Sequence, residues 1–331
     1  MLIECVPNIS EGRDLAAISA VVDAVAAVPD VKVLHVDTNA DAHRTVLTFA
    51  GPEAAVEEGA RALIAAAIEA IDMRRHFGVH PRIGAVDVVP FVPLEDGGME
   101  RCVELSKRVA ERAAREHALP IFLYEQSASS EARRNLADIR RGHYEGLAVK
   151  LTLPEWKPDF GPTQPHPSAG ATVVGARDFL IAFNISLGTQ DVRIAREIAK
   201  RVRSLGDDGG LRLPFCKAIG WMMEGYHCAQ VSINLTNFRV TGMYDAFVAV
   251  SNEAARRGIP VIGSELIGLV PKAALLDVAA AIGVGGDMMT GDALNSAVDF
   301  LGLGRVAPFI LEEKVLEHQL ERAFARRFEL R

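Results

Sequence analysis

The sequence is poor in cysteine, and its few cysteines are not arranged in pairs. Cys5, Cys102, Cys216 and Cys228 are the four cysteines among 331 residues, and no two of them have the CxxC spacing. Disulfide frameworks need several cysteines that can pair, and many structural zinc sites need cysteines at short, regular spacings in the sequence. The pattern argues against a disulfide-rich secreted domain and predicts reduced thiols in the core of a cytoplasmic protein.

The sequence also lacks a net positive charge and a long apolar run. Its formal net charge is −7 and its pI is about 5.8, which argues against nonspecific binding to nucleic acid or acidic membranes. The first ten residues contain no basic segment and predict a strand rather than a signal peptide. Arg61 and Glu69 interrupt one apolar stretch, and Lys272 and Asp277 interrupt another. No charge-free run approaches the ~20 residues that span a bilayer, so we expect no membrane partner. Because the net charge is negative, we also expect no nucleic-acid partner.

Several common functional motifs are missing as well. The glycines of GVGGD at 283–287 do not follow a strand and open a helix, so they are no dinucleotide fingerprint. There is no phosphate-binding P-loop, no GxSxG elbow, and no interleaving of basic and aromatic residues. A metal site is conceivable from His35, Asp37, Asp41, His43 and His80, but their spacing matches no closed zinc pattern. The sequence therefore predicts no metal.

What the sequence does have is a repeated order of elements. We expect strands at 2–9, 31–37, 44–50, within 78–91, and at 120–125, 179–187, 216–223, 229–238 and 260–265. We expect helices at 14–28, 52–72, 99–117, within 127–140, and at 191–203, 243–257, 271–282 and 311–327, with a glycine-rich loop at 204–211. Each half begins strand, helix, strand, strand, helix, strand, which is the split βαβ order of a ferredoxin-like unit.

These elements predict an α+β protein of two ferredoxin-like subdomains, with facing mixed β-sheets and helices on the outer faces. The proline-rich stretch 156–170 is a poor helix or strand and a good linker or binding loop. We place the domain boundary just after it, with subdomains 1–177 and 178–331.

His80 begins the stretch that is most promising for chemistry, HPRIGAVDVVPF. Pro81 favours an extended backbone at His80, and Gly84 permits a close backbone approach. Histidine titrates near neutrality, at about pH 6.5, so it can both accept and return a proton. Local chemistry leaves two interpretations of His80 open, a structural role in the turn and a catalytic role. Arg82 is likewise either a substrate contact or an ordinary surface charge.

A second polar group follows the second predicted strand. The spacing of His35-Val36-Asp37 places His35 and Asp37 on one strand face. A carboxylate there could orient a catalytic imidazole. Arg44 lies at the start of the next strand and is a candidate for local positive charge.

Six sequence blocks resemble one known family. They are VPNISEGR (6–13), RTVLTFAG (44–51), HPRIGAVDVVPF (80–91), PDFGP (158–162), GATVVGARDFLIAFNI (170–185) and QVSINLTNF (230–238). Together and in this order they are similar to the glutamate formimidoyltransferases. In animals these enzymes form the N-terminal part of a bifunctional formimidoyltransferase-cyclodeaminase. The present sequence ends without a cyclodeaminase region, so it resembles the monofunctional form.

The resemblance implies a function in histidine breakdown and one-carbon metabolism. It implies transfer of the formimino group from N-formimidoyl-L-glutamate to N5 of tetrahydrofolate, which releases L-glutamate. Tetrahydrofolate would be a co-substrate, bound in a tunnel between the two sheets of a homodimeric, cytoplasmic enzyme. His80 matches the family's catalytic histidine, and Asp37 matches the aspartate that assists it.

The resemblance also indicates binding residues. Folate contacts are expected in 161–170, including Gly161, Pro162, Thr163 and Gly170, and in roughly 213–221, including Gly220 and Trp221. Asn184, Asn234 and Asn237 lie on strands expected to face the tunnel, and Arg44 and Arg82 are the candidates for binding anionic substrate groups. Ala169 stands where the animal members carry an aromatic residue, so a stacking contact with the pterin is expected to be absent.

Three other functions remain open at this stage. Formyl transfer from N-formylglutamate needs nearly the same shape of donor. A folate- or anion-binding module without turnover would use the same surfaces. A metal-dependent hydrolase would use the histidine and aspartate residues at 35–43.

Overall fold

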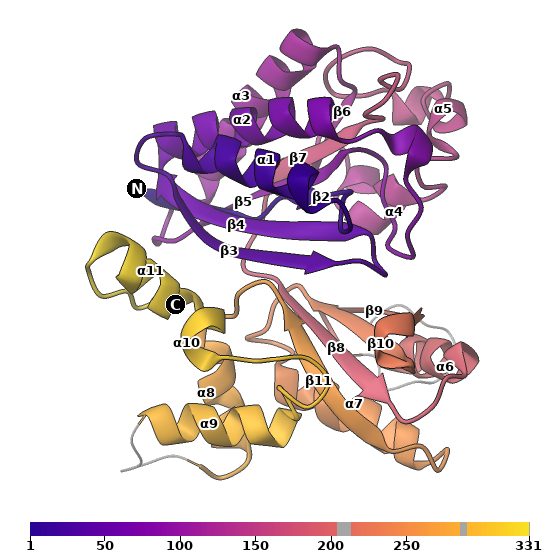
Figure 1. The fold of residues 1–331 in the computed structure, drawn as a ribbon, viewed down its shortest axis with the longest axis vertical. Helices are drawn as coiled ribbons and strands as arrows, with labels where there is room; N and C mark the ends of the chain where they lie inside the picture. Colours follow the sequence, from indigo (N-terminus) through magenta and orange to yellow (C-terminus); the bar gives the residue numbers. More distant parts are fainter. Residues whose placement is uncertain (204–212, 285–289, 331) are drawn as a thin grey trace. The chain divides into compact units, whose positions relative to one another are not determined.

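The computed structural model describes residues 1–203, 213–284 and 290–330. The described chain divides into two compact units, Met1–Arg177 and Asp178–Arg331 (Figure 1). Each unit has its own sheet and its own hydrophobic core. The predicted loop at 204–211 lies outside the described residues, as does most of the GVGGD segment.

The N-terminal unit is built on a seven-stranded sheet in which β3, β4, β1 with β2, β5, β7 and β6 lie side by side in that order. The strands are β1 (Leu2–Cys5), β2 (Asn8–Ile9), β3 (Lys32–Asn39), β4 (Arg44–Pro52), β5 (Val86–Pro93), β6 (Ile121–Glu125) and β7 (Thr172–Ala176). The pairings from β3 to β5 are antiparallel, whereas β7 runs parallel to both β5 and β6. This sheet is therefore mixed, as predicted.

Three long helices cover one face of this sheet: α1 (Leu15–Ala26), α2 (Glu53–Ala70) and α3 (Met99–His117) (Figure 1). Phe49, Phe91 and Leu105 are fully buried in the core that they form. The opposite face is covered over β5, β7 and β6 by the short helices α4 (Leu136–Arg140) and α5 (Leu147–Lys150). Single 3-10 turns at Met73–Arg75, Glu131–Arg133 and Pro154–Trp156 complete the unit.

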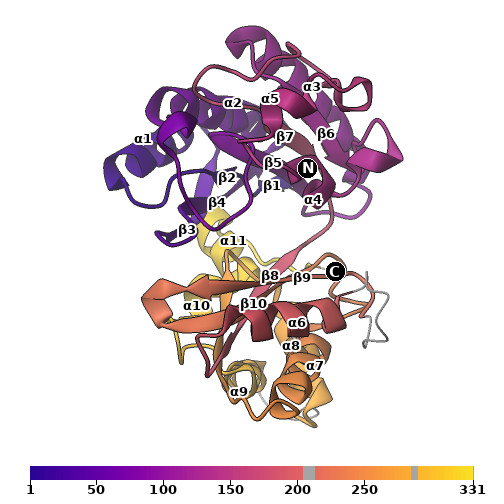
Figure 2. The same cartoon turned by 90° about the vertical axis from the view of Figure 1, so that its right-hand side faces the viewer.

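The C-terminal unit has a four-stranded sheet in the order β11-β8-β10-β9, and every pairing in it is antiparallel. Its strands are β8 (Ile181–Leu187), β9 (Cys216–Met223), β10 (Cys228–Leu235) and β11 (Val261–Ile267), and a 3-10 turn spans Glu224–Tyr226. Its helices are α6 (Val192–Val202), α7 (Met243–Ala255), α8 (Lys272–Ala281), α9 (Thr290–Leu301), α10 (Leu311–Lys314) and α11 (Leu316–Phe324). Figure 2 shows α6 and α7 on the same side of this sheet, where Phe183 and Val231 form part of the core.

The ferredoxin-like prediction is confirmed for both units. In the C-terminal unit the last strand, β11, lies beside the first, β8, and β10 separates β8 from β9. The same order recurs as β5-β1-β4-β3 in the N-terminal sheet, which α3, β6 and β7 extend. The predicted mixed sheet applies to the N-terminal unit alone, because the four paired strands of the C-terminal unit are antiparallel.

The prediction of the elements was wrong at several places. Pro7 divides the first strand into β1 and β2, while the buried run at 172–176, to which we assigned no element, is strand β7. Helix α9 replaces a region for which we predicted no regular structure. The predicted C-terminal helix is broken at Val315, which is extended because it pairs with Val270 through Val270 N–Lys314 O (2.9 Å) and Leu316 N–Val270 O (2.9 Å).

Among the residues that the structure describes, no helix combines the length and the apolar character needed to cross a bilayer.

Candidate active site

His80 lies on a loop that two neighbouring segments hold in place. The loop follows the 3-10 turn Met73–Arg75 and leads into β5. Its backbone is tied to the segment 168–171 by Met73 N–Ser168 O (2.8 Å), Ala85 N–Ala169 O (2.9 Å) and Ala171 N–Ile83 O (3.1 Å). A side chain at Gly84 would place its Cβ 2.0 Å from the carbonyl oxygen of Ala171, so this approach requires glycine. The structure thus brings together two of the predicted site stretches, 80–84 and 161–170.

His43 holds the His80 loop through its ring. Nδ1 of His43 lies 2.8 Å from the carbonyl oxygen of Phe77, and Nε2 lies 3.0 Å from Oε1 of Glu11. A carbonyl and a carboxylate are both acceptors, so the ring of His43 links two acceptors, one on the His80 loop and one on Glu11. Partial burial opposes the ionisation of Glu11, but backbone N–H donors from Asp14 and Arg13 and the charge of His43 outweigh it and lower its pKa.

His76 is neutral, and its tautomer follows from its partners. Nε of Arg82 donates to Nδ1 of His76 (3.0 Å), so the proton of the ring is on Nε2, which donates to the carbonyl oxygen of His43 (2.8 Å). The ring stacks on that of His43 with centroids 4.1 Å apart. Burial, followed by the charges of His43 and Arg82, lowers the pKa of His76 to about 4. The neutral ring of His76, bonded to Arg82 and stacked on His43, therefore supports the loop.

The guanidinium of Arg82 forms hydrogen bonds within the N-terminal unit. Besides His76 it contacts Glu145 through two bonds, NH2–Oε1 (2.7 Å) and NH1–Oε2 (3.0 Å), and it is buried. The hydrogen bonds from Arg82 lower the pKa of Glu145 to about 2. A substrate contact by Arg82 stays a prediction, whereas the contacts that the structure shows hold the His80 loop.

His80 itself is half-buried, in a positive environment. Burial of the imidazole lowers its pKa well below the ordinary value, and the charges of Arg44 and Arg140 lower it further. The ring is therefore neutral at pH 7 and able to accept a proton. Arg140, on α4, was not among the residues that the sequence indicated.

Asp37 and Arg44 lie on the face of the N-terminal sheet opposite α1, α2 and α3. Asp37 pairs with Val46, and Arg44 pairs with Asn39, so all four side chains point to one face. Oδ2 of Asp37 lies 3.6 Å from Nε2 of His35, as the extended spacing predicted. Assistance of His80 by Asp37 stays a prediction.

Backbone geometry requires glycine at two positions of the predicted folate loop. Gly161 has φ +86°, and a Cβ there would lie 2.2 Å from the carbonyl oxygen of Leu119. Gly170 has φ +73°, with a Cβ position 2.3 Å from the carbonyl oxygen of Ile83. Pro162 and Thr163 between them are exposed. Ala169 is buried in the N-terminal core, so its side chain occupies a packing position rather than a stacking position.

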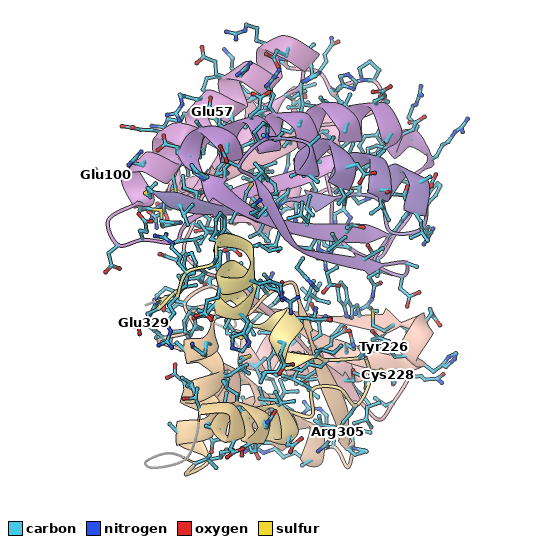
Figure 3. The ribbon with its side chains drawn as sticks, turned by 60° about the vertical axis from the view of Figure 1, so that its left-hand side comes forward. Glu57, Glu100, Tyr226, Cys228, Arg305 and Glu329 are labelled. Atoms are coloured by element: carbon cyan, nitrogen blue, oxygen red, sulfur yellow. The ribbon has the colours of Figure 1, made fainter. Side chains whose placement is uncertain are left out.

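The C-terminal sheet carries a hydrogen-bonded polar network on the face opposite its core. Trp221 is paired with Gln230, Gln230 with Ser186, and Asn184 with Glu265, so these side chains share that face. The bonds are Trp221 Nε1–Gln230 Oε1 (3.0 Å), Gln230 Nε2–Ser186 Oγ (3.0 Å), Gln230 Nε2–Glu265 Oε1 (3.1 Å), Asn184 Nδ2–Glu265 Oε1 (3.1 Å) and Tyr226 OH–Glu265 Oε2 (2.9 Å). Figure 3 labels Tyr226 at the turn between β9 and β10.

The other C-terminal predictions divide between the two faces. Asn234 lies on the polar face, opposite Lys217 and Ala182. Gly220 lies on the core side, where a Cβ would be 2.2 Å from the backbone nitrogen of Arg196, so it allows α6 to approach the sheet. Asn237 is not on a strand, because β10 ends at Leu235. Its side chain accepts from the backbone of Arg239 (3.2 Å) and closes a turn.

Sequence reasoning missed Gln230, Glu265, Ser186 and Tyr226. Two signals were present. Gln230, Ser232 and Asn234 alternate with apolar residues, which is typical of a strand with one polar face. A carboxylate also stands inside the apolar strand VIGSELI.

Within the described ranges, no group of three or more histidine, cysteine, aspartate or glutamate side chains is arranged to hold a metal ion. The four cysteines are buried, and they are thiols rather than halves of disulfides.

Comparison with known proteins gives matches along nearly the whole chain. The model of the formiminotransferase domain, N-terminal subdomain, matches residues 2–177, and that of the formiminotransferase domain matches residues 182–321. A protein of Streptococcus pyogenes named glutamate formimidoyltransferase is 48% identical over 278 residues, with 84% of this chain and 92% of that protein covered. One of the same name from Thermoplasma acidophilum is 44% identical, with 84% and 91% covered. The formimidoyltransferase-cyclodeaminase of Sus scrofa is 42% identical, and there the match covers 97% of this chain and 60% of the pig protein.

Proposed function

This chain belongs to the formiminotransferase family and transfers a formimino group from N-formimidoyl-L-glutamate to tetrahydrofolate, and we propose that His80 moves the protons of that reaction. The observation that carries the proposal is the neutral His80 ring on a firmly held loop beside two arginines. A general base must be unprotonated at the working pH, and this environment keeps the imidazole so.

The chemistry needs one group that first accepts and then donates. N5 of tetrahydrofolate attacks the formimino carbon, and His80 accepts the proton that N5 loses as the new C–N bond forms. The tetrahedral intermediate then breaks its bond to the glutamate nitrogen, to which His80 returns the proton. L-Glutamate leaves, and the formimino group remains on N5. Such acid–base help accelerates a reaction by about 10²–10⁴-fold, and holding both substrates together adds to it.

Asp37 and Arg44 complete the N-terminal part of the proposed site. Protonation of His80 beside two arginines is unfavourable. A nearby carboxylate would therefore stabilise the imidazolium that forms when His80 accepts the proton of N5. Asp37 is our candidate, since its pair with Val46 is two residue pairs along β3 and β4 from the pair of Arg44 with Asn39, on the same face. Arg44 supplies positive charge for anionic substrate groups.

We assign folate binding to two surfaces, one on each unit. On the N-terminal unit it is the loop 161–170, where Pro162 and Thr163 are exposed and Gly161 and Gly170 fix the backbone. On the C-terminal unit it is the polar face with Asn184, Trp221 and Asn234, for which Gly220 provides close packing from behind. The fixed amides and indole would present donors and acceptors to a pterin. Enclosure of the folate between the two sheets stays a prediction from the resemblance.

The remaining proposals concern the protein as a whole. We propose a cytoplasmic homodimer that works without a metal, with the units 1–177 and 178–331 as its two subdomains. Light scattering at several protein concentrations tests the dimer. Full activity after treatment with a chelator tests the absence of a metal, and loss of activity that added metal restores would contradict it.

An assay with formiminoglutamate and tetrahydrofolate tests the function. The absorbance of the methenyl product after acid treatment reports transfer, and the absence of product from the folded protein would contradict the proposal. A parallel series with N-formylglutamate separates the two donors. We expect kcat/KM to favour the formimino donor, because Asp37 can pair with a cationic amidine and not with a neutral formamide.

A further inference from the structure

Asp87 connects the turn that carries His80 with an arginine from another element. It lies in β5 and is buried. Its Oδ1 accepts from the backbone N–H of Ile83 (2.8 Å), three residues after His80, and its Oδ2 forms an ion pair with NH2 of Arg140. One carboxylate therefore fixes both the turn and the guanidinium, and the two are held in register with one another.

Arg140 is held rigidly but does not use all of its donors. Only 12% of its side chain is exposed, and Nε is buried without a hydrogen-bond partner in the part of the chain that the structure describes. Its helix is anchored by Lys150, whose Nζ donates to the carbonyl oxygens of Asp138 (3.0 Å) and Ile139 (2.5 Å) and lies over the ring of Trp156. Because a buried guanidinium N–H ordinarily has an acceptor, Arg140 is suited to an anion that arrives with the substrate.

The donor carries such an anion close to its reacting carbon. The formimino carbon is bonded to the α-nitrogen of glutamate, and the α-carboxylate is attached to the next carbon. Three bonds of about 1.3–1.5 Å thus separate the reacting carbon from the carboxylate carbon. The tail carboxylates of tetrahydrofolate, by contrast, lie beyond the aminobenzoyl group. A cation next to His80 therefore matches the α-carboxylate of the donor.

We propose that Arg140, held by Asp87, binds the α-carboxylate of the formimino donor and positions the formimino carbon at His80. This inference rests on the proposed function. It makes Arg140 a determinant of specificity for α-amino acid donors, with Asp87 as its positioning residue.

The test is a comparison of two donors on two enzymes. N-formimidoyl-L-glutamate is compared with N-formimidoyl-4-aminobutyrate, which keeps the distal carboxylate and lacks the α-carboxylate. For Arg140→Gln we expect the KM of formiminoglutamate to rise about 10- to 100-fold, the size of a charge-assisted hydrogen bond, with the KM of tetrahydrofolate nearly unchanged. The preference for the donor with the α-carboxylate should shrink by a similar factor. Arg140→Lys, which keeps the charge, should restore part of it.

Arg141→Gln is the matched control. Arg141 is the next residue, and 79% of its side chain is exposed, so its loss should leave both KM values unchanged. An unchanged preference between the two donors in Arg140→Gln would overturn the proposal. A rise in the KM of tetrahydrofolate alone would overturn it too, because it would assign Arg140 to the folate tail.

Binding of L-glutamate and 4-aminobutyrate, measured by calorimetry, separates this inference from the proposed reaction. The parent protein should bind L-glutamate more tightly, and Arg140→Gln and Arg140→Lys should lose that difference in whole or in part. This readout needs no turnover, so it stands if the transfer assay fails. Equal binding of both ligands by the parent protein would contradict the role of Arg140. Thermal melting of each variant shows whether it is folded.

Discussion

The two sheets of this protein carry polar faces of different chemistry. Around His80 on the N-terminal unit the polar groups are ionic, with Arg44 and Arg140 close enough to change the proton affinity of the ring. On the C-terminal sheet, amides, a hydroxyl and an indole surround one carboxylate, that of Glu265. Under the proposed function this difference corresponds to a division of labour, in which charges tune proton transfer and fixed neutral dipoles orient a bound molecule. Substitutions on either face test this difference.

The largest effect is expected from His80→Ala. Removal of the proposed acid–base group should lower kcat by about 10²–10⁴-fold. The dissociation constant of tetrahydrofolate, measured by fluorescence titration, should change little. An equally large loss of folate affinity would show that His80 binds rather than reacts.

Because His76 is buried as a neutral ring that supports the His80 loop, the free energy of unfolding should depend on pH. The pKa of His76 falls from about 6.5 in the unfolded chain to about 4 in the folded protein. Between these values the unfolded state binds more protons, so stability is lost as the pH falls through this window. The loss should amount to about 2–3 kcal/mol at pH 4.5 relative to pH 7.

Urea unfolding at the two pH values measures this effect. In His76→Gln the pH-dependent loss should be smaller by that amount, while the contributions of Glu11 and the other titratable groups stay common to both proteins. An identical loss in the variant would assign the pH dependence to other groups.

Glu265→Gln alters the C-terminal side of the comparison. The amide cannot accept from Asn184, Gln230 and Tyr226 at once, so the free energy of unfolding should fall by about 1–3 kcal/mol. The KM of tetrahydrofolate should rise several-fold while kcat stays within a factor of about two. Glu224→Gln, at an exposed position beside the same turn, is the control and should change neither. A fall in kcat with an unchanged KM would contradict the division of labour.

The smallest effect is expected from Asn237→Ala. Loss of its bond to the backbone of Arg239 should cost about 0.5–1 kcal/mol of stability, without a change in the KM of tetrahydrofolate. Asn184→Ala, within the network, should raise that KM. If the two variants change the KM of tetrahydrofolate equally, Asn237 belongs to the polar network even though it lies beyond the end of β10.

The sequence predicted the element order of both units because strand and helix periods are local properties. It failed at β7, a five-residue buried run behind a proline-rich loop, whose strand character comes from parallel pairing with β5 and β6. It failed at Val315, where pairing with the distant Val270 overrides helix propensity. Long-range backbone partners of this kind leave no local pattern.

The same distinction holds for the site. His80 stands out through its neighbours Pro81 and Gly84, and the His35–Asp37 pair follows from strand spacing. Arg140 could not be predicted, because only the fold brings a residue 60 positions later beside the turn. Arg82 was expected at the substrate, yet the fold provides it with His76 and Glu145.

The dependence of kcat/KM on pH, with formiminoglutamate as donor, tests the central claim most directly. If His80 is the base, activity should fall on the acid side with a midpoint below pH 6.5, because burial and the charges of Arg44 and Arg140 lower the pKa of the ring. Removing the charge in Arg140→Gln should move that midpoint upward, and the residual activity of His80→Gln should lack it. An acid limb at the same pH in His80→Gln would show that another group moves the proton.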